Sequence, residues 1–279
     1  LLSVAAYAQT TDPRELVQLG NRALAQGRYY DAIELYFDAQ ATNPSYFDAL
    51  YGLARAYYRL EEYDESLGYL VQAERFTRNN VDLRNLRGQL LVAVGRLEDA
   101  REQFASVIEA EPNNLEARLG LAELELARGR TEAAAATLED TIRLYPENRK
   151  ALLSLVLVYD YRGRTDISQR YLEQALRYHR TDPAVHVLAA EHYLTVDALD
   201  DARLHAMTAL SLSPDNMEAL RLLSRAELAA GRPQAALSIA EQLLSLDPSS
   251  VEGLYLAGRG HAQLEEYDEA LKAWNHISI

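Results

Sequence analysis

The side chains most able to do chemistry in this 279-residue sequence are its histidines and carboxylates. The six histidines are His179, His186, His192, His205, His261 and His276. None belongs to an HExxH pair, and a spacing of six does not place His186 and His192 on one face of a helix. The chain has no cysteine, which excludes thiolate metal sites, disulfides and cysteine nucleophiles. We therefore expect no metal site and no cofactor.

Catalytic motifs are also missing from the sequence. It contains no Gly-x-Ser-x-Gly, and Gly258-Arg259-Gly260 is too short for a phosphate-binding loop and lies in a predicted helix. Most carboxylates fall on outward helical positions, which indicates a solvated face. The sequence therefore predicts that the protein is not an enzyme.

The charge of the chain opposes a nucleic-acid partner, and its hydropathy opposes a membrane-spanning helix. The net charge of −14 and the pI near 4.9 oppose general binding to nucleic acid. No apolar run approaches the roughly 20 residues that a membrane-spanning helix needs.

The first ten residues, LLSVAAYAQT, form a short apolar segment. Ala6-Tyr7-Ala8 before Gln9 fits the small-x-small pattern of a signal-peptide cleavage site. We expect residues 1–12 to be a signal-peptide remnant or, alternatively, an N-terminal segment that caps the first repeat. A signal peptide would place the protein in a bacterial periplasm or cell envelope.

An internal repeat organises the remaining chain. The phrase LEEYDE occurs at residues 60–65 and again at 264–269, a separation of 204 residues or six times 34. In this register, position 20 is always small, position 15 is mostly glycine and position 32 is mostly proline. Apolar residues at positions 4, 7, 8 and 11 predict a first helix, and those at 17, 20, 21, 24 and 27 predict a second. The repeats begin at Pro13, Phe47, Val81, Leu115, Arg149, Pro183, Met217 and Val251.

The repeat resembles the tetratricopeptide repeat (TPR). The family motif is matched by Leu16-Leu19-Gly20, Ala32-Tyr36 and Pro44, and the resemblance covers nearly the whole chain. It implies an all-α, right-handed α-solenoid over residues 13–279, with seven full repeats and an incomplete eighth. Arg84 and Arg87 depart from the pattern at positions 4 and 7 of the third repeat.

By this resemblance, positions 2, 5, 9 and 12 of the first helices line a concave groove. In the middle repeats these positions are apolar, and we expect an exposed floor on which a partner's apolar side chains dock. The alternative is that the N-terminal segment or a tight superhelix covers them. The floor residues are Leu119, Leu126, Leu153, Leu157, Val187 and Leu194.

Two further groups complete the predicted groove. Tyr51, Arg55 and Tyr58 combine the residue types enriched in binding hot spots. Arginines at corresponding helix positions near the C-terminus could hold carboxylates of a partner. Ion pairs with Glu191, Glu218 and Glu252 are the alternative. These arginines are Arg221, Arg225 and Arg259.

These observations predict a non-catalytic scaffold that binds a protein or peptide segment in its groove, in envelope assembly or secretion. One alternative is an accessory region of a larger enzyme, such as a glycosyltransferase. Another is self-assembly into homo-oligomers through uncapped solenoid ends.

Overall fold

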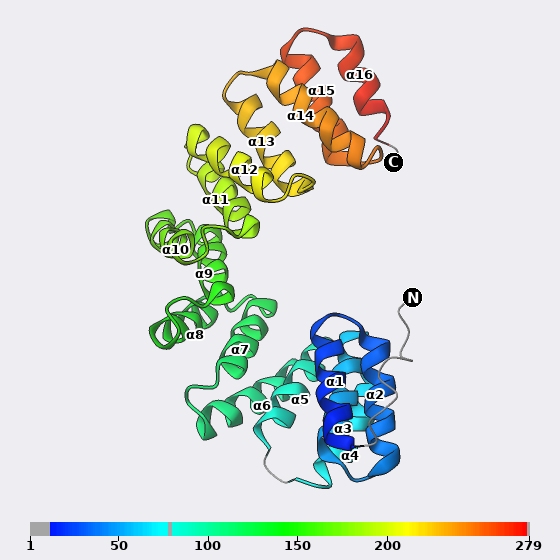
Figure 1. Ribbon diagram of the computed structural model, residues 1–279. Helices are drawn as coiled ribbons and strands as arrows, with labels where there is room; N and C mark the ends of the chain where they lie inside the picture. Colours follow the sequence, from blue (N-terminus) through cyan, green and yellow to red (C-terminus); the bar gives the residue numbers. More distant parts are fainter. Residues whose placement is uncertain (1–11, 78–79, 278–279) are drawn as a thin grey trace. The chain divides into compact units, whose positions relative to one another are not determined.

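A computed structural model describes residues 12–77 and 80–277, and every regular element in these ranges is an α-helix (Figure 1). The helices are α1 (Pro13–Ala25), α2 (Tyr29–Thr42), α3 (Phe47–Arg59), α4 (Tyr63–Glu74), α5 (Val81–Ala93), α6 (Leu97–Ala110), α7 (Leu115–Ala127), α8 (Thr131–Leu144), α9 (Arg149–Tyr161), α10 (Thr165–Tyr178), α11 (Pro183–Thr195), α12 (Leu199–Leu212), α13 (Met217–Ala229), α14 (Pro233–Leu246), α15 (Val251–Gln263) and α16 (Tyr267–Asn275). The predicted all-α solenoid of tandem helix pairs is confirmed.

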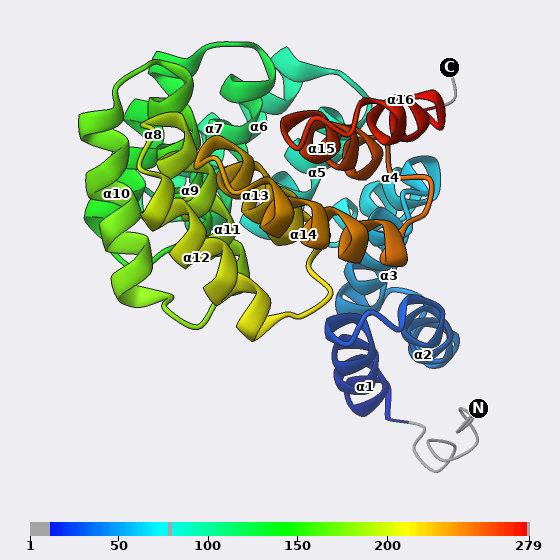
Figure 2. The same cartoon turned by 90° about the horizontal axis from the view of Figure 1, so that it is seen from above.

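The chain divides into two compact units, with the boundary inside α8 between Thr137 and Leu138. Within each unit, consecutive helices pack side by side, as both views show (Figure 1, Figure 2).

All eight first helices begin at the residue that the repeat register assigns to position 1, from Pro13 in α1 to Val251 in α15. Except at Tyr46, the residue before each start is an N-cap whose side chain accepts a backbone N–H. Such a cap satisfies a donor that the helix itself cannot bond. The capping residues are Asp12, Asn80, Asn114, Asn148, Asp182, Asn216 and Ser250.

The turn inside each pair uses a left-handed residue at position 15. Five glycines hold this place, with φ between 68° and 77°, and so end the first helix. Glu61, Asp197 and Glu265 adopt the same conformation with φ of 64°, 58° and 64°. Glu61 and Glu265 belong to the two LEEYDE phrases, so the repeated phrase marks a left-handed turn without glycine.

In the first unit, an aromatic ring sets how closely neighbouring helices approach. The ring of Phe104 on α6 is fully buried between Gly88 of α5 and Gly120 of α7. A Cβ added at either glycine would lie 2.6 Å from the ring. Tyr36 on α2 is buried between two glycines in the same way.

Two junctions between repeats carry the same buried ion pairs. Glu125 on α7 is 5% exposed and lies 3.4 Å from both Arg101 on α6 and Arg130 in the turn before α8. Glu227 on α13, 3% exposed, is held in the second unit by arginines from α12 and from the turn after α13. We call this arrangement the Arg–Glu–Arg clamp. It joins position 11 of one repeat to position 21 of the preceding repeat and to its own position 16.

A histidine pair lies between α11 and α12. The Nδ1 atoms of His186 and His205 are 2.9 Å apart, and Nε2 of His186 lies 2.9 Å from the backbone oxygen of Arg180. Because a carbonyl can only accept, Nε2 of His186 carries a proton, and when His186 is neutral its Nδ1 accepts a hydrogen bond from Nδ1 of His205. Tyr193 stacks on His205 with ring centroids 5.4 Å apart. Burial, and then the neighbouring His186, lower the pKa of His205, while Asp201 opposes this shift.

The close contact between Gly88 and the Phe104 ring predicts opposite effects for two Gly→Ala changes. Gly88→Ala forces a Cβ against the Phe104 ring and should lower the free energy of unfolding by about 1–3 kcal/mol. Gly68→Ala is the matched control, because α4 leaves open space there and alanine favours a helix by about 0.8–1 kcal/mol. Urea unfolding followed by circular dichroism measures both. Equal changes in the free energy of unfolding would contradict a close contact between Gly88 and the Phe104 ring.

The histidine pair predicts a pH-dependent stability. Since the pKa of His205 is lowered on folding, the unfolded chain binds more protons near pH 6, and acid favours unfolding. The stabilisation should be complete above about pH 6.5 and should be lost as the pH falls below it. Thermal melts of the native chain and of His205→Phe from pH 7.5 to 5 test this. As the pH falls, the melting temperature of the native chain should decrease relative to that of His205→Phe, whereas His276→Phe, at an exposed histidine, should follow the native curve.

Candidate functional site

The tyrosine and arginine residues predicted for the groove come together on α3. Tyr51 is half-buried and stacks on Phe47 with centroids 5.9 Å apart, and the Arg55 guanidinium lies 5.6 Å from the Tyr51 ring centroid. Arg55 is exposed and forms no hydrogen bond or ion pair with any residue that the structure describes. Burial, followed by the charge of Asp82, raises the pKa of Tyr51 to about 12, so its hydroxyl remains protonated. Tyr58, also half-buried, packs into the same core cluster.

Two amide side chains on α5, which were not predicted from the sequence, lie near this group. Asn85, 1% exposed, donates from Nδ2 to Oδ1 of Asn114 at 3.1 Å, and Gln89 donates to Glu116 on α7 at 2.8 Å. The Oδ1 atom of Asn85 is buried without a hydrogen-bond partner in the described part of the chain. Asn85 and Gln89 occupy positions 5 and 9 of the third repeat. Tyr51 also occupies position 5 of its repeat, so the same register could have predicted them.

The expected apolar floor is mostly packed rather than exposed. Only Leu157 among the six predicted residues is exposed, at 52%. Leu153 packs against a buried cluster of the second unit, and Val187 and Leu194 pack against another. Leu119 and Leu126 on α7 are half-buried. Leu153, Val187 and Leu194 pack against buried residues of other helices, so they contribute to the core.

Arg221 lies among three carboxylates. Its Nε is 2.8 Å from Glu218, and its terminal nitrogens lie 3.8 Å from Glu252 and 4.0 Å from Glu191. The hydrogen bond with Arg221 lowers the pKa of Glu218. The ion-pair alternative considered from the sequence therefore describes Arg221. Arg225 and Arg259 are exposed and form no hydrogen bond or ion pair with described residues.

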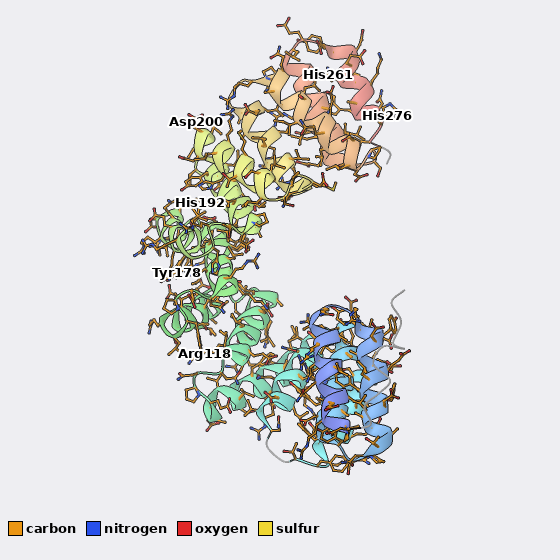
Figure 3. All side chains as sticks on the ribbon, viewed as in Figure 1. Arg118, Tyr178, His192, Asp200, His261 and His276 are labelled. Carbon is orange, nitrogen blue, oxygen red and sulfur yellow. The ribbon has the colours of Figure 1, made fainter. Side chains whose placement is uncertain are left out.

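A serine, a histidine and an aspartate meet in the second unit, but their geometry does not form a catalytic triad. Nδ1 of His192 lies 2.8 Å from Asp160, and Ser168 bonds the same carboxylate. His192, which is 1% exposed, belongs to α11 (Figure 3). Ser168 also lies on the Nδ1 side of the ring, at 3.3 Å, while Nε2 faces Gln169 at 3.0 Å. A triad needs the serine and the carboxylate on opposite nitrogens. This cluster links α9, α10 and α11 by hydrogen bonds.

Among the residues that the structure describes, no three His, Asp or Glu side chains lie close enough to hold a metal ion. None of the described helices combines the length and the hydropathy required for a membrane crossing.

Comparison with curated proteins finds short matches. RNA polymerase II-associated protein 3 from Rattus norvegicus and from Mus musculus is 31% identical over 99 residues, which are 36% of this chain. The human protein is 29% identical over the same length. The matched region spans only 15% of these relatives.

Solved structures with the same fold cover more of the chain. The Cut9–Hcn1 complex matches with a TM-score of 0.66 and 14% identity, over 94% of this chain and 52% of the other. A tetratricopeptide repeat protein from Parabacteroides merdae matches with a TM-score of 0.62 and 17% identity, over 89% of this chain and 98% of the other. MamA matches with a TM-score of 0.53 and 16% identity, over 58% of this chain and 89% of the other. Because the sequence identities are this low, these matches show a shared fold and nothing about function.

Family profiles described as tetratricopeptide repeat match most of the sequence. The matches cover residues 23–90, 85–149, 153–216 and 217–260. They agree with the helix pairs, the left-handed turns and the 34-residue register of the structure. The chain therefore belongs to the tetratricopeptide repeat family.

Proposed function

We propose that the protein is a non-catalytic scaffold that binds a segment of another protein on the surface of its first helices. The observation that carries this proposal is the exposed Arg55 guanidinium, which lies over the Tyr51 ring and forms no ion pair with described residues. An arginine held against an aromatic ring loses little freedom on binding and keeps its hydrogen-bond donors available. Membership of a family of interaction repeats supports the same function.

The chemistry around Arg55 indicates what the segment presents. Arg55 offers donors to a carboxylate or a backbone carbonyl, and the protonated Tyr51 hydroxyl can donate as well. On α7, Glu116 accepts from Gln89 and provides negative charge that also reaches Tyr51. A segment with an acidic or carbonyl group for Arg55 and an amide or basic group for Glu116 fits this surface.

In the second unit, Leu157, Arg225 and Arg259 are the predicted groove residues that stay exposed. We include them in the proposed binding surface of that unit. Arg221 has a different role there, since its charge is already satisfied by three carboxylates.

We further propose that the protein works in a bacterial cell envelope. This rests on the sequence of the first ten residues, which lie outside the described part of the structure, and on the cleavage pattern Ala6-Tyr7-Ala8.

The scaffold proposal predicts that Arg55→Glu abolishes capture of a partner. Tagged native and variant chains would be incubated with extract of the source cell. The retained proteins would be quantified by mass spectrometry with stable-isotope labels. Arg170→Glu on α10 is the control, because it makes the same charge change at an exposed arginine of a second helix. At least one protein should be retained tenfold less by Arg55→Glu alone. Equal retention by all three chains would refute binding at Arg55.

The envelope proposal predicts a processed N-terminus. When the full reading frame is expressed in a bacterium, mass spectrometry of the mature protein should find Gln9 as its first residue. Replacing both Ala6 and Ala8 by leucine should block cleavage, because signal peptidase requires small residues there. An unprocessed native chain recovered from the cytoplasm would contradict export.

A further inference from the structure

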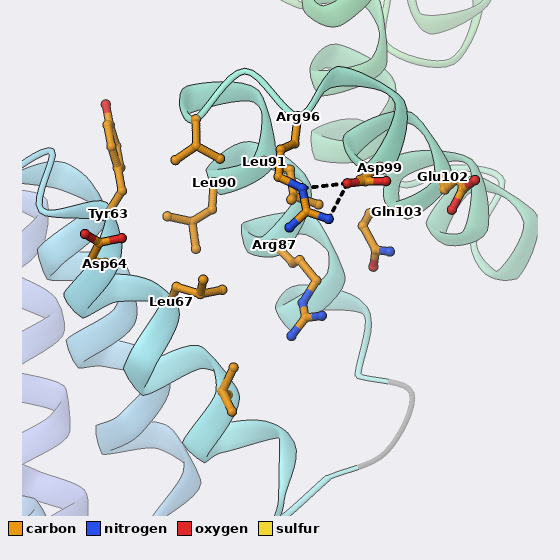
Figure 4. Close-up of a pocket in the computed structure, with 12 residues that line it drawn as sticks. Tyr63, Asp64, Leu67, Arg87, Leu90, Leu91, Arg96, Asp99, Glu102 and Gln103 are labelled. Atoms are coloured by element: carbon orange, nitrogen blue, oxygen red, sulfur yellow. Dashed lines mark hydrogen bonds and ion pairs between the residues drawn. The ribbon is translucent and has the colours of Figure 1, made fainter.

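An apolar hollow lies between the second and third repeats of the first unit. It has a volume of about 430 Å³ and opens between α4 on one side and α5 and α6 on the other (Figure 4). Its apolar lining includes Leu67, Val71, Leu90, Leu91 and Val94. Three of these are substantially exposed: Leu67 at 42%, Val71 at 40% and Val94 at 51%. None of the residues predicted for the groove lines it.

The repeat register explains why this junction is hollow. At the next junction, positions 21, 11 and 16 hold the clamp of Arg101, Glu125 and Arg130. At the hollow, the same three positions are Leu67, Leu91 and Arg96. The two leucines cannot form the clamp, and Arg96 instead bonds Asp99 of its own repeat at 2.6 Å (Figure 4).

The neighbouring helices reinforce the opening. α4 ends at Glu74 after 12 residues, whereas α2 and α6 each contain 14. On α5, Arg87 replaces an apolar residue of the pattern and reaches back to Glu74 at 2.6 Å. The Nε atom of Arg87 is buried without an acceptor among the described residues, and Arg87 lines the hollow.

The charges at the margin select the occupant. Both arginines of the lining are already paired, Arg87 with Glu74 and Arg96 with Asp99. Asp64 and Glu102 also line the hollow, and neither forms a hydrogen bond or ion pair within the described chain. The charges left without a partner are therefore negative. They favour a basic group beside the apolar hollow.

We propose that this hollow is a second docking site, which takes a large apolar side chain of a partner protein with a lysine or arginine close to it in sequence. The apolar side chain covers Leu67, Leu91 and Val94, and the basic group pairs with Asp64 or Glu102. This site is separate from the surface around Arg55 and does not depend on binding there.

A library of random twelve-residue peptides displayed on phage tests the proposal with the full native chain as bait. Retained phage would be counter-selected on Leu67→Glu, which places a charge in the hollow at an exposed position. Leu271→Glu is the matched control, because Leu271 is also an exposed leucine at position 21 of its repeat, on α16. Circular dichroism melts would establish that both variants are folded.

Selected peptides should combine a large apolar residue with a lysine or arginine within a few positions. Their affinity, measured by fluorescence anisotropy, should fall at least tenfold with Leu67→Glu and several-fold with Asp64→Asn combined with Glu102→Gln. Leu271→Glu should leave it unchanged. The proposal is overturned if no peptide distinguishes Leu67→Glu from Leu271→Glu. Selected peptides that are acidic, or that lose binding with Arg55→Glu instead, would also overturn it. If Leu67→Glu fails to fold, Val94→Glu replaces it in the same comparison.

Discussion

The apolar side of each helix pair can be covered only by the next pair, and the rest of this structure depends on that contact. The small residues at position 20 allow it, because each one is almost fully buried where two helices meet. Where the small residue is Ser66, its hydroxyl donates to the backbone oxygen of Ala54 at 2.6 Å, so its burial leaves no hydroxyl without a hydrogen bond. The small residues are Ala32, Ser66, Ala100, Ala134, Ser168, Ala202, Ala236 and Ala270.

Because stacking is secured by these small residues and by the rings between glycines, other junction positions can differ. A buried carboxylate such as Glu227 would be costly alone, but two guanidinium groups compensate its desolvation. At another junction Gln169 donates to the hydroxyl of Tyr193 at 3.2 Å. The hollow at Leu67 is the same place left without a polar bridge. Variation within one frame thus produces both junctions joined by polar contacts and candidate binding sites.

The helices could be predicted from the sequence more fully than the candidate site. Helix starts, N-caps and left-handed turns follow from signals within a few residues, and the 34-residue register repeats them. The state of a groove residue depends instead on residues one repeat away. Leu153 and Val187 are half-buried for this reason.

Arg221 shows the same limit. Two of its carboxylates, Glu191 and Glu252, lie about one repeat before and after it, so their approach depends on how the repeats stack. The sequence suggested these partners but could not decide between ion pairs and a free charge. The burial of Asn85 and its hydrogen bond to Asn114 could not be identified from the sequence, because both depend on how the next repeat stacks.

The Arg–Glu–Arg clamps give the array a fixed order. Glu125 requires an arginine at position 21 of the repeat that precedes it, and Arg101 supplies it. If the fourth repeat were moved to follow the second, Glu125 would face Leu67 and lose one of its two cations. The repeats share a common fold, yet they are not interchangeable modules. Duplication, deletion or shuffling of whole repeats would be penalised at these joints, even where the 34-residue length was kept.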